Sequence, residues 1–173
     1  MPDKELPPKI HFDLLGPAHD RARFSCGVPA LDTYLQKQAR QDVRRRVAVA
    51  FVATPDGKTI AGYYTLSQYS VELGVLPEEI AGKLPRYPLV PATLIGRLAV
   101  SAAFRGRGIG ELLLMDALSR CLYGSREIAS AAVIVDAKDD GAVAFYRKYG
   151  FLELPKIAMR LFLPMATVEA LFG

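Results

Sequence analysis

The stretch from residue 94 to residue 110, LIGRLAVSAAFRGRGIG, constrains the fold most, because an apolar run changes there into a glycine-rich turn. At its start, five apolar residues predict a buried strand: Leu94, Ile95, Leu98, Ala99 and Val100. In the turn, Gly106, Gly108 and Gly110 carry no side chain, so the backbone can approach a ligand closely. The stretch therefore predicts a strand, a phosphate-binding loop and a helix, in that order.

The segment that follows the loop predicts a helix with one buried face. Small or apolar residues recur there in steps of i, i+3, i+4, i+7, i+8 and i+11, at Gly110, Leu113, Leu114, Ala117, Leu118 and Cys121. A helix that begins at a glycine-rich loop presents unpaired N–H donors and the positive end of its dipole. With Arg105 and Arg107 beside these donors, the site suits a diphosphate.

Two common phosphate-binding motifs do not fit this loop. No Gly-Lys-Ser/Thr follows, which excludes a Walker motif, and the glycines are shifted from the positions of a dinucleotide-binding fingerprint. A plain loop whose glycines only begin a helix is the alternative to phosphate binding. Taken alone, these residues leave both interpretations open.

Strand and helix patterns on both sides of this stretch predict a mixed sheet flanked by helices, in a single domain over residues 1–173. The Asp56-Gly57 pair predicts a hairpin turn. Besides the central strand and helix, the expected strands are residues 10–15, 47–53, 59–69, 130–136 and 159–163, and the expected helices are residues 31–39, 77–83 and 141–149.

Two ordered patterns resemble the GNAT acetyltransferase superfamily. Arg105-x-x-Gly108-x-Gly110, after a strand that ends in Leu-Ala-Val, resembles its acetyl-coenzyme A signature, and AVAFYRKYGF at residues 142–151 resembles its second signature. The resemblance implies an α/β (α+β mixed) GNAT fold, whose splayed central strands expose backbone to the pantetheine arm of acetyl-coenzyme A. We also count Phe145, from the Phe-Tyr pair, with the cofactor-binding residues. These are Leu98, Ala99, Val100, Arg105, Gly106, Arg107, Gly108, Ile109, Gly110 and Phe145.

Tyr146 is the predicted general acid. Acyl transfer from a thioester needs a proton for the departing thiolate, and a phenol with a pKa near ~10 stays protonated at neutral pH. The resemblance points to the same tyrosine, whereas the alternative is an aromatic side chain that packs in the core. The general base is not evident, because the central strand carries no carboxylate. Asp136 and Glu72 are candidates, although each is also explained as a solvated loop carboxylate.

The excess positive charge is concentrated in one short window. The net charge is +4, and without residues 37–46 the acidic and basic residues balance. The window holds Asp42 and five basic residues, which are Lys37, Arg40, Arg44, Arg45 and Arg46. Such a concentration favours a polyanion, most commonly nucleic acid, whereas the alternative is a solvated helix face.

The remaining composition narrows the compartment and the chemistry. Only two cysteines occur, Cys26 and Cys121, which favours a reducing compartment and hence a cytoplasmic protein. No apolar stretch reaches the roughly 18 residues of a membrane span, so no membrane association is expected. The two histidines, His11 and His19, are too isolated in the sequence to predict a metal site.

A narrower resemblance covers most of the chain. The patterns FSCG and LDTYL near residues 24–35, GYYTL at 62–66 and GRLAV at 96–100 resemble the GNAT toxins of bacterial type II toxin–antitoxin pairs. Those toxins acetylate the amino group of charged tRNA, and a small ribbon-helix-helix antitoxin neutralises them. The resemblance implies aminoacyl-tRNA as substrate, bound at the basic window, together with such an antitoxin and a homodimer. An α-amine of an aminoacyl ester also needs less help from a base than a lysine side chain, whose pKa is about 10.4.

Two other functions compete with this one. The first is a housekeeping N-acetyltransferase that acts on a small amine or a protein amine. The second is a coenzyme A-binding partner protein that has the fold but no turnover.

Overall fold

The computed structural model describes residues 9–173, and its contacts divide the chain into two compact units. The first unit comprises the chain up to residue 66 together with residues 97–117, and the second comprises residues 67–96 and 118–173. Neither unit is one continuous segment, because β3, β4 and α4 each run from one unit into the other. The single-domain organisation stays a prediction.

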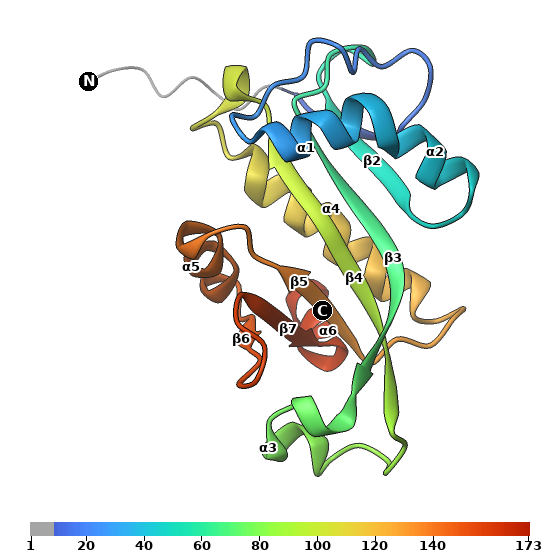
Figure 1. Cartoon of the computed structure of the whole chain (residues 1–173), viewed down its shortest axis with the longest axis vertical. Coiled ribbons are helices and arrows are strands. Elements are labelled where there is room, and N and C mark those ends of the chain that lie inside the picture. The colour runs from blue at the N-terminus through green and yellow to red at the C-terminus, as the bar shows by residue number, and fades with distance from the viewer. Residues whose placement is uncertain (1–8) are drawn as a thin grey trace. The chain divides into compact units, whose positions relative to one another are not determined.

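Figure 1 shows the elements in chain order. They are β1 (His11–Leu14), α1 (Pro29–Thr33), the π-helical turn η1 (Tyr34–Gln38), α2 (Ala39–Arg44), β2 (Val49–Thr54), β3 (Gly62–Glu72), the 3-10 turn η2 (Leu73–Val75), α3 (Glu78–Ala81), β4 (Leu89–Val100), the 3-10 turn η3 (Ala102–Phe104), α4 (Ile109–Gly124), β5 (Ala132–Asp136), α5 (Asp140–Lys148), β6 (Leu152–Glu153), β7 (Arg160–Pro164) and α6 (Met165–Phe172). The predicted central strand and helix are present, and α4 buries five of its six predicted core positions, all except Gly110.

The strands form one mixed sheet in the order β1-β2-β3-β4-β5-β7-β6. β4 and β5 pair in parallel from Ala92↔Ala132 to Ile95↔Val135, whereas β1–β2, β2–β3, β5–β7 and β6–β7 are antiparallel. β4 continues beyond this parallel register as far as Val100. The prediction of a mixed sheet with flanking helices is confirmed.

The first unit has its core where the N-terminal helix packs on the sheet. Its buried residues are Phe24, Cys26, Tyr34, Leu35, Ala39, Val52, Ile60, Tyr63 and Ala99. The sequence has apolar residues at helical spacing at Leu31, Tyr34, Leu35 and Ala39, of which the last three are buried and Leu31 is half-buried against the same core. This spacing did not indicate the π-helical turn between α1 and α2. Such turns insert a residue into a helix and are common at functional sites.

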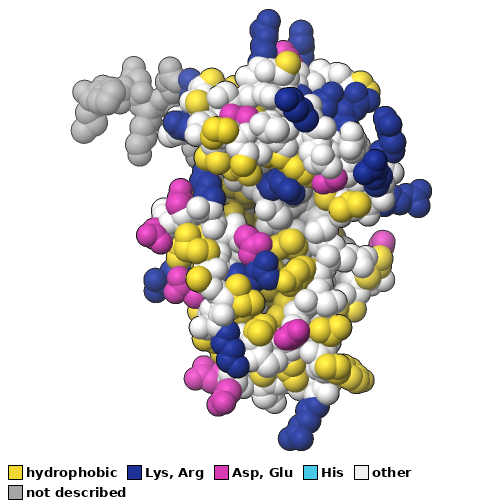
Figure 2. Space-filling model, viewed as in Figure 1, with side chains coloured by type: hydrophobic (Ala, Val, Ile, Leu, Met, Phe, Trp, Pro, Cys, Tyr) yellow, Lys and Arg dark blue, Asp and Glu magenta, His cyan; other side chains and the backbone are white. Residues whose placement is uncertain are grey.

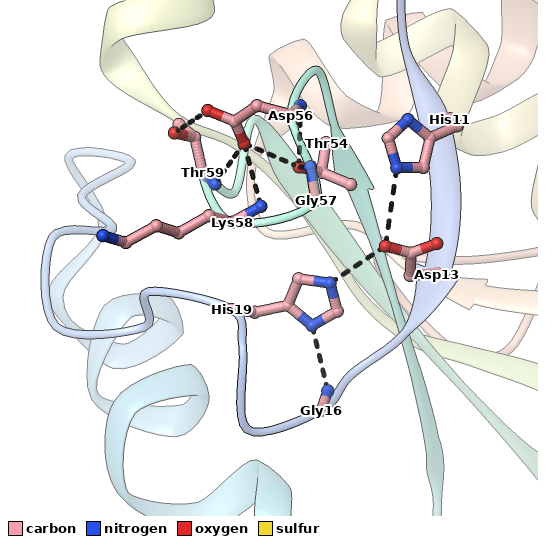
Figure 3. Close-up of polar contacts among 9 residues, drawn as sticks. All are labelled: His11, Asp13, Gly16, His19, Thr54, Asp56, Gly57, Lys58 and Thr59. Carbon is pink, nitrogen blue, oxygen red and sulfur yellow. Dashed lines mark hydrogen bonds and ion pairs between the residues drawn. The ribbon is translucent and has the colours of Figure 1, made fainter.

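The predicted hairpin turn between β2 and β3 is also present. Asp56 accepts hydrogen bonds from the backbone N–H groups of Lys58, at 2.9 Å, and Thr59, at 2.6 Å, and Figure 3 shows this network. These bonds hold the pKa of the Asp56 carboxyl well below its usual value. Gly57 has φ +80°, a conformation that L side chains rarely adopt.

Some predicted boundaries were wrong for local reasons. The strand expected from residue 47 begins at Val49, because the N–H groups of Val47 and Ala48 bond to the Asp42 carbonyl at 2.9 and 3.4 Å. These bonds continue the turn that ends α2, so the two residues are not free to join the sheet. The short strand β6 was not predicted at all.

The second unit has a separate core on the other part of the sheet. It consists of Val71, Leu76, Val90, Ala92, Ile134, Leu154 and Phe162. The helix α5 lies in this unit, and its first turn is capped by Asp139, whose Oδ1 accepts the Ala142 N–H at 2.8 Å. Among residues 9–173, no helix is both long and apolar enough to cross a membrane.

Replacing Asp139 by alanine should lower the free energy of unfolding by about 1 kcal/mol, because the cap of α5 is lost. Chemical denaturation followed by circular dichroism measures this change. Asp140→Ala is the matched control, since Asp140 is exposed in the same turn and contributes only its interaction with the helix dipole, a few tenths of a kcal/mol. Equal losses in the two variants would show that Asp139 has no special capping role.

Candidate active site

The glycine-rich loop adopts a conformation that requires glycine. Gly106 has φ +75° and Gly108 has φ +78°, in the region that L side chains rarely occupy. A Cβ on either residue would meet nothing within 4 Å, so the requirement comes from the backbone and not from crowding. The open space on this side of the loop leaves room for a ligand.

The backbone donors of the loop are available to an anion. The first hydrogen bond of α4 joins Leu112 N–H to the Gly108 carbonyl at 3.2 Å. Within the described chain, the N–H groups of Gly106, Gly108, Ile109 and Gly110 donate no hydrogen bond. They lie at the start of a sixteen-residue helix, where the dipole also favours negative charge. The residues present therefore fit the diphosphate of a coenzyme.

The Arg105 side chain has a structural contact that the sequence did not indicate. Its Nη2 donates to the Cys26 carbonyl at 2.5 Å, and the Ala102 N–H donates to the Ser25 carbonyl at 2.8 Å. Gly27, with φ +83°, makes room for this guanidinium, because a Cβ there would lie 2.6 Å from Nη2. The segment around Cys26 therefore fixes the chain just before the glycine-rich loop.

A second close approach fixes the strand beneath the loop. A Cβ on Gly62 would lie 2.7 Å from Leu113 Cδ1 and 2.9 Å from the Ala99 carbonyl oxygen. The glycine therefore lets β3, β4 and α4 approach one another, which sets the position of the helix start relative to the predicted cofactor strand. This role had no signal in the sequence beyond the presence of a glycine in an apolar strand.

Tyr146 lies on α5 in an apolar setting. Its ring is in edge contact with Phe145, at 5.3 Å between centroids, and with Phe151, at 5.4 Å. Burial raises the pKa of the Tyr146 hydroxyl above its usual value, and the negative charge of Asp136 raises it further. The phenol is therefore protonated at neutral pH.

The Tyr146 hydroxyl has no protein partner to which it is committed. It makes no hydrogen bond to another residue in the range 9–173. The side chain as a whole is only 5% exposed. A hydroxyl that is not committed to another protein group is suited to proton donation to a bound ligand.

Asp136 is engaged in an ion pair. Arg160 Nε donates to Asp136 Oδ1 at 2.6 Å and its Nη2 donates to Oδ2 at 3.0 Å, while Nη1 donates to the Tyr69 hydroxyl. The contact with Asp136 raises the pKa of the Arg160 guanidinium. Because both carboxylate oxygens are occupied, Asp136 is poorly suited to the role of a general base. Glu72 is exposed at the end of β3.

The basic window forms an exposed surface, as its composition suggested. Lysine and arginine side chains project in Figure 2 from the region where Figure 1 draws α1 and α2. All five basic residues of the window are exposed, namely Lys37, Arg40, Arg44, Arg45 and Arg46. The acidic residue of the window is instead turned toward the protein, since Asp42 accepts from the Tyr34 hydroxyl at 2.9 Å and from Gln38 Nε2 at 3.0 Å. Burial and the hydrogen bond to Asp42 raise the pKa of the Tyr34 hydroxyl to about 12.

Both histidines lie near the Asp13 carboxylate, although their spacing in the sequence did not predict this contact. Figure 3 shows His11 Nε2 at 3.6 Å and His19 Nε2 at 3.1 Å from Asp13 Oδ2. The Gly16 N–H donates to His19 Nδ1 at 2.9 Å, so the buried His19 ties β1 to the following turn. No group of three or more His, Cys, Asp or Glu in the part of the chain that the structure describes could hold a metal ion.

Comparison with known proteins agrees with these features. Residues 46–153 match the model of the acetyltransferase (GNAT) domain. The chain is 36% identical over 156 residues to the tRNA-acetylating toxin of Mycobacterium tuberculosis, which covers 90% of this chain and 92% of that one. It is 34% identical over 163 residues to the probable toxin TacT of Sinorhizobium fredii, with 90% of each chain covered.

A solved structure agrees over nearly the whole chain. AtaT complexed with acetyl-methionyl-tRNAfMet matches with a TM-score of 0.88 and 27% identity, over 95% of this chain and 100% of that chain. The protein belongs to the GNAT acetyltransferase family, in the group that contains the tRNA-acetylating toxins. It is an acetyltransferase, and its acetyl donor is acetyl-coenzyme A.

Proposed function

We propose that the protein acetylates the amino group of aminoacyl-tRNA and so acts as a toxin that blocks translation. The observation that carries this proposal is the likeness to the tRNA-acetylating toxin over nine-tenths of the chain. The exposed basic window supports it, because a tRNA acceptor presents a phosphate backbone to which arginine and lysine side chains bind. The structural relative AtaT, solved with acetylated methionyl-tRNA, supports the same substrate class.

The coenzyme binds, in this proposal, at the loop of the first unit. The N–H groups of Gly106, Gly108, Ile109 and Gly110 hold its diphosphate, and Arg105 and Arg107 add positive charge. The backbone of Leu98, Ala99 and Val100 pairs with the pantetheine arm, and Phe145 contributes an apolar contact. The unpaired loop donors and the left-handed glycines support this assignment.

Tyr146 acts as the general acid of the reaction. Bound acetyl-coenzyme A supplies an activated acetyl group as a thioester, whose carbon–sulfur bond breaks as the amine nitrogen bonds to the carbonyl carbon. Tyr146 donates its hydroxyl proton to the departing sulfur and recovers a proton from solvent. The raised pKa keeps the Tyr146 hydroxyl protonated at neutral pH. Desolvation also raises the pKa of the thiol that leaves in the same apolar surroundings, so the thiolate remains basic enough to accept the proton.

The amine proton leaves to water without a carboxylate base. The central strand carries no acidic residue, and the strongest alternative, Asp136, is held on both oxygens by Arg160. An aminoacyl ester amine needs less help than a lysine amine, because the adjacent carbonyl withdraws electrons and lowers the pKa of the amine. The absence of a base in β4 therefore favours an aminoacyl ester as the acceptor.

The proposal extends to the cellular setting. A toxin that acts on charged tRNA works in the cytoplasm and requires an antitoxin, which we expect to be a ribbon-helix-helix protein. We also expect a homodimer, in which two basic windows present one surface to the tRNA, and a single catalytic domain in each copy. Size-exclusion chromatography with light scattering tests the dimer directly.

Charge reversal in the basic window should abolish most tRNA acetylation. The triple variant Arg44→Glu, Arg45→Glu, Arg46→Glu replaces three contacts to phosphate by repulsion, so the kcat/KM for aminoacyl-tRNA should fall roughly 10²-fold or more. Acetylation of tRNA and inhibition of growth are the two measurements. The KM for acetyl-coenzyme A should not change.

A matched control tests whether the effect depends on where the charges are reversed or only on the change in net charge. Lys83→Glu, Arg86→Glu, Arg126→Glu makes the same change in net charge at exposed positions outside the window. It should leave tRNA acetylation nearly intact. Unchanged tRNA acetylation and growth inhibition in the window variant would count against the basic window as the tRNA-binding surface. Absence of tRNA acetylation by the unaltered protein would favour a housekeeping N-acetyltransferase.

A further inference from the structure

A cavity of about 260 Å³ lies in the second unit, beneath the end of β3. Its apolar wall is built by Val71, Val75, Leu154 and Ile157. Val71 and Leu154 are buried, and Val75 and Ile157 are half-buried members of the same core cluster. The wall is therefore firmly packed on the sheet, while the two half-buried side chains keep contact with solvent.

The polar wall of the cavity is formed by Tyr69, Ser70, Glu72 and Arg160. Arg160 uses Nε and Nη2 for Asp136 and Nη1 for the Tyr69 hydroxyl, whereas Glu72 is exposed. The guanidinium lies 5.1 Å from the centre of the Tyr69 ring. Because the Arg160 guanidinium is already paired with the Asp136 carboxylate, the cavity offers no free cation to an anionic ligand.

Two physical connections join this cavity to Tyr146, which belongs to the same unit. The first is electrostatic, since Asp136, the partner of Arg160, contributes to the raised pKa of Tyr146. The second is packing, because the Tyr146 ring contacts Phe151, and the chain then passes through β6 to Leu154 in the cavity wall. The Leu154 N–H also bonds to the Arg160 carbonyl at 2.9 Å.

We propose that this cavity receives the side chain of the aminoacyl group, and that it selects apolar side chains of middle size, such as those of leucine, isoleucine and methionine. The inference rests on the proposed function. The volume is below the ~300–1,000 Å³ of pockets that enclose drug-sized ligands, so the cavity suits one side chain and not a nucleotide. A carboxylate side chain would lose its hydration there without gaining a free partner from Arg160, and it would lie beside the carboxylate of Glu72.

Two variants change the size of the cavity in opposite directions. Val75→Phe fills it, so the kcat/KM for leucyl- and methionyl-tRNA should fall roughly tenfold or more while alanyl-tRNA is affected little. Ile157→Ala enlarges it and should shift the preference toward phenylalanyl-tRNA. The measurement is acetyl transfer from radiolabelled acetyl-coenzyme A to a panel of purified tRNAs charged with alanine, leucine, methionine, phenylalanine, aspartate or lysine.

The control is Ile128→Phe, at a position of the same unit that is 65% exposed and does not line the cavity. It should leave the ranking of the panel unchanged. Acetylation of the panel by the unaltered protein, with the same ranking in Val75→Phe and Ile157→Ala, would overturn the cavity assignment and leave the proposed function standing. Failure of the unaltered protein to acetylate any charged tRNA would overturn both.

Discussion

Replacing Tyr146 by phenylalanine should reduce the kcat for acetyl transfer roughly 10²-fold or more, whereas the affinity for acetyl-coenzyme A should stay close to that of the unaltered protein. The substitution removes only the hydroxyl, which makes no hydrogen bond to another described residue, and keeps the ring that packs on Phe145 and Phe151. The fold therefore loses little, and the effect reports on proton donation. Single-turnover kinetics and calorimetric titration of acetyl-coenzyme A separate the two quantities.

Tyr149→Phe is the matched control for this variant. It removes a hydroxyl from a half-buried tyrosine at the end of the same helix, which we do not place in the catalytic machinery. Its kcat should remain near the unaltered value. A Tyr146→Phe protein with full activity would rule out this residue as the acid, and full biological function without turnover would point to the coenzyme A-binding partner protein.

The pH dependence of kcat gives a further check on Tyr146. Because burial raises the pKa of the hydroxyl above its reference value of about 10, the acid form persists from neutral pH to at least that value. Loss of this proton should therefore produce no alkaline decline in kcat below pH ~10. A decline near pH 8 that disappears in Tyr146→Phe would mean that the hydroxyl titrates in a more polar setting than the structure shows.

The central part of the fold was predictable because each signal there is local. The apolar run of β4, the glycines of the loop and the helical spacing of Leu113, Leu114 and Leu118 are properties of neighbouring residues. The Asp56-Gly57 turn is equally local, since its hydrogen bonds join residues at most three positions apart. The start of β2 was misplaced because it depends on bonds to a carbonyl of the preceding helix, which a strand pattern does not register.

The surroundings of the site were not predictable, because they join residues that are distant in sequence. Arg160 meets Asp136 across 24 positions and Tyr69 across 91, so no spacing rule links them. The bond between Arg105 and the Cys26 carbonyl spans 79 positions in the same way. Sequence reasoning named Asp136 and Arg105 for a base and for a phosphate contact, and only the packed structure reveals what already occupies them.

Alanine at both loop glycines should weaken the binding of acetyl-coenzyme A far more than it weakens the fold. Gly106 and Gly108 have φ +75° and +78°, and an L side chain in that conformation costs about 1–2 kcal/mol. The exposed loop can relieve this strain by changing shape, but the N–H groups then no longer converge on one anion. Binding of acetyl-coenzyme A has to return the loop to its strained conformation. Each substitution should therefore raise the Kd for acetyl-coenzyme A roughly 5- to 30-fold.

Gly57→Ala provides the same strain at a different place. Gly57 has φ +80° and nothing within 4 Å of its missing Cβ, but it lies in the β2–β3 hairpin turn held by Asp56. Calorimetric titration should show the unaltered Kd in this variant and the weakened Kd in the double variant Gly106→Ala, Gly108→Ala. Equal Kd values in all three proteins would mean that the loop amides do not bind the diphosphate, because the strain would then have no consequence for the ligand.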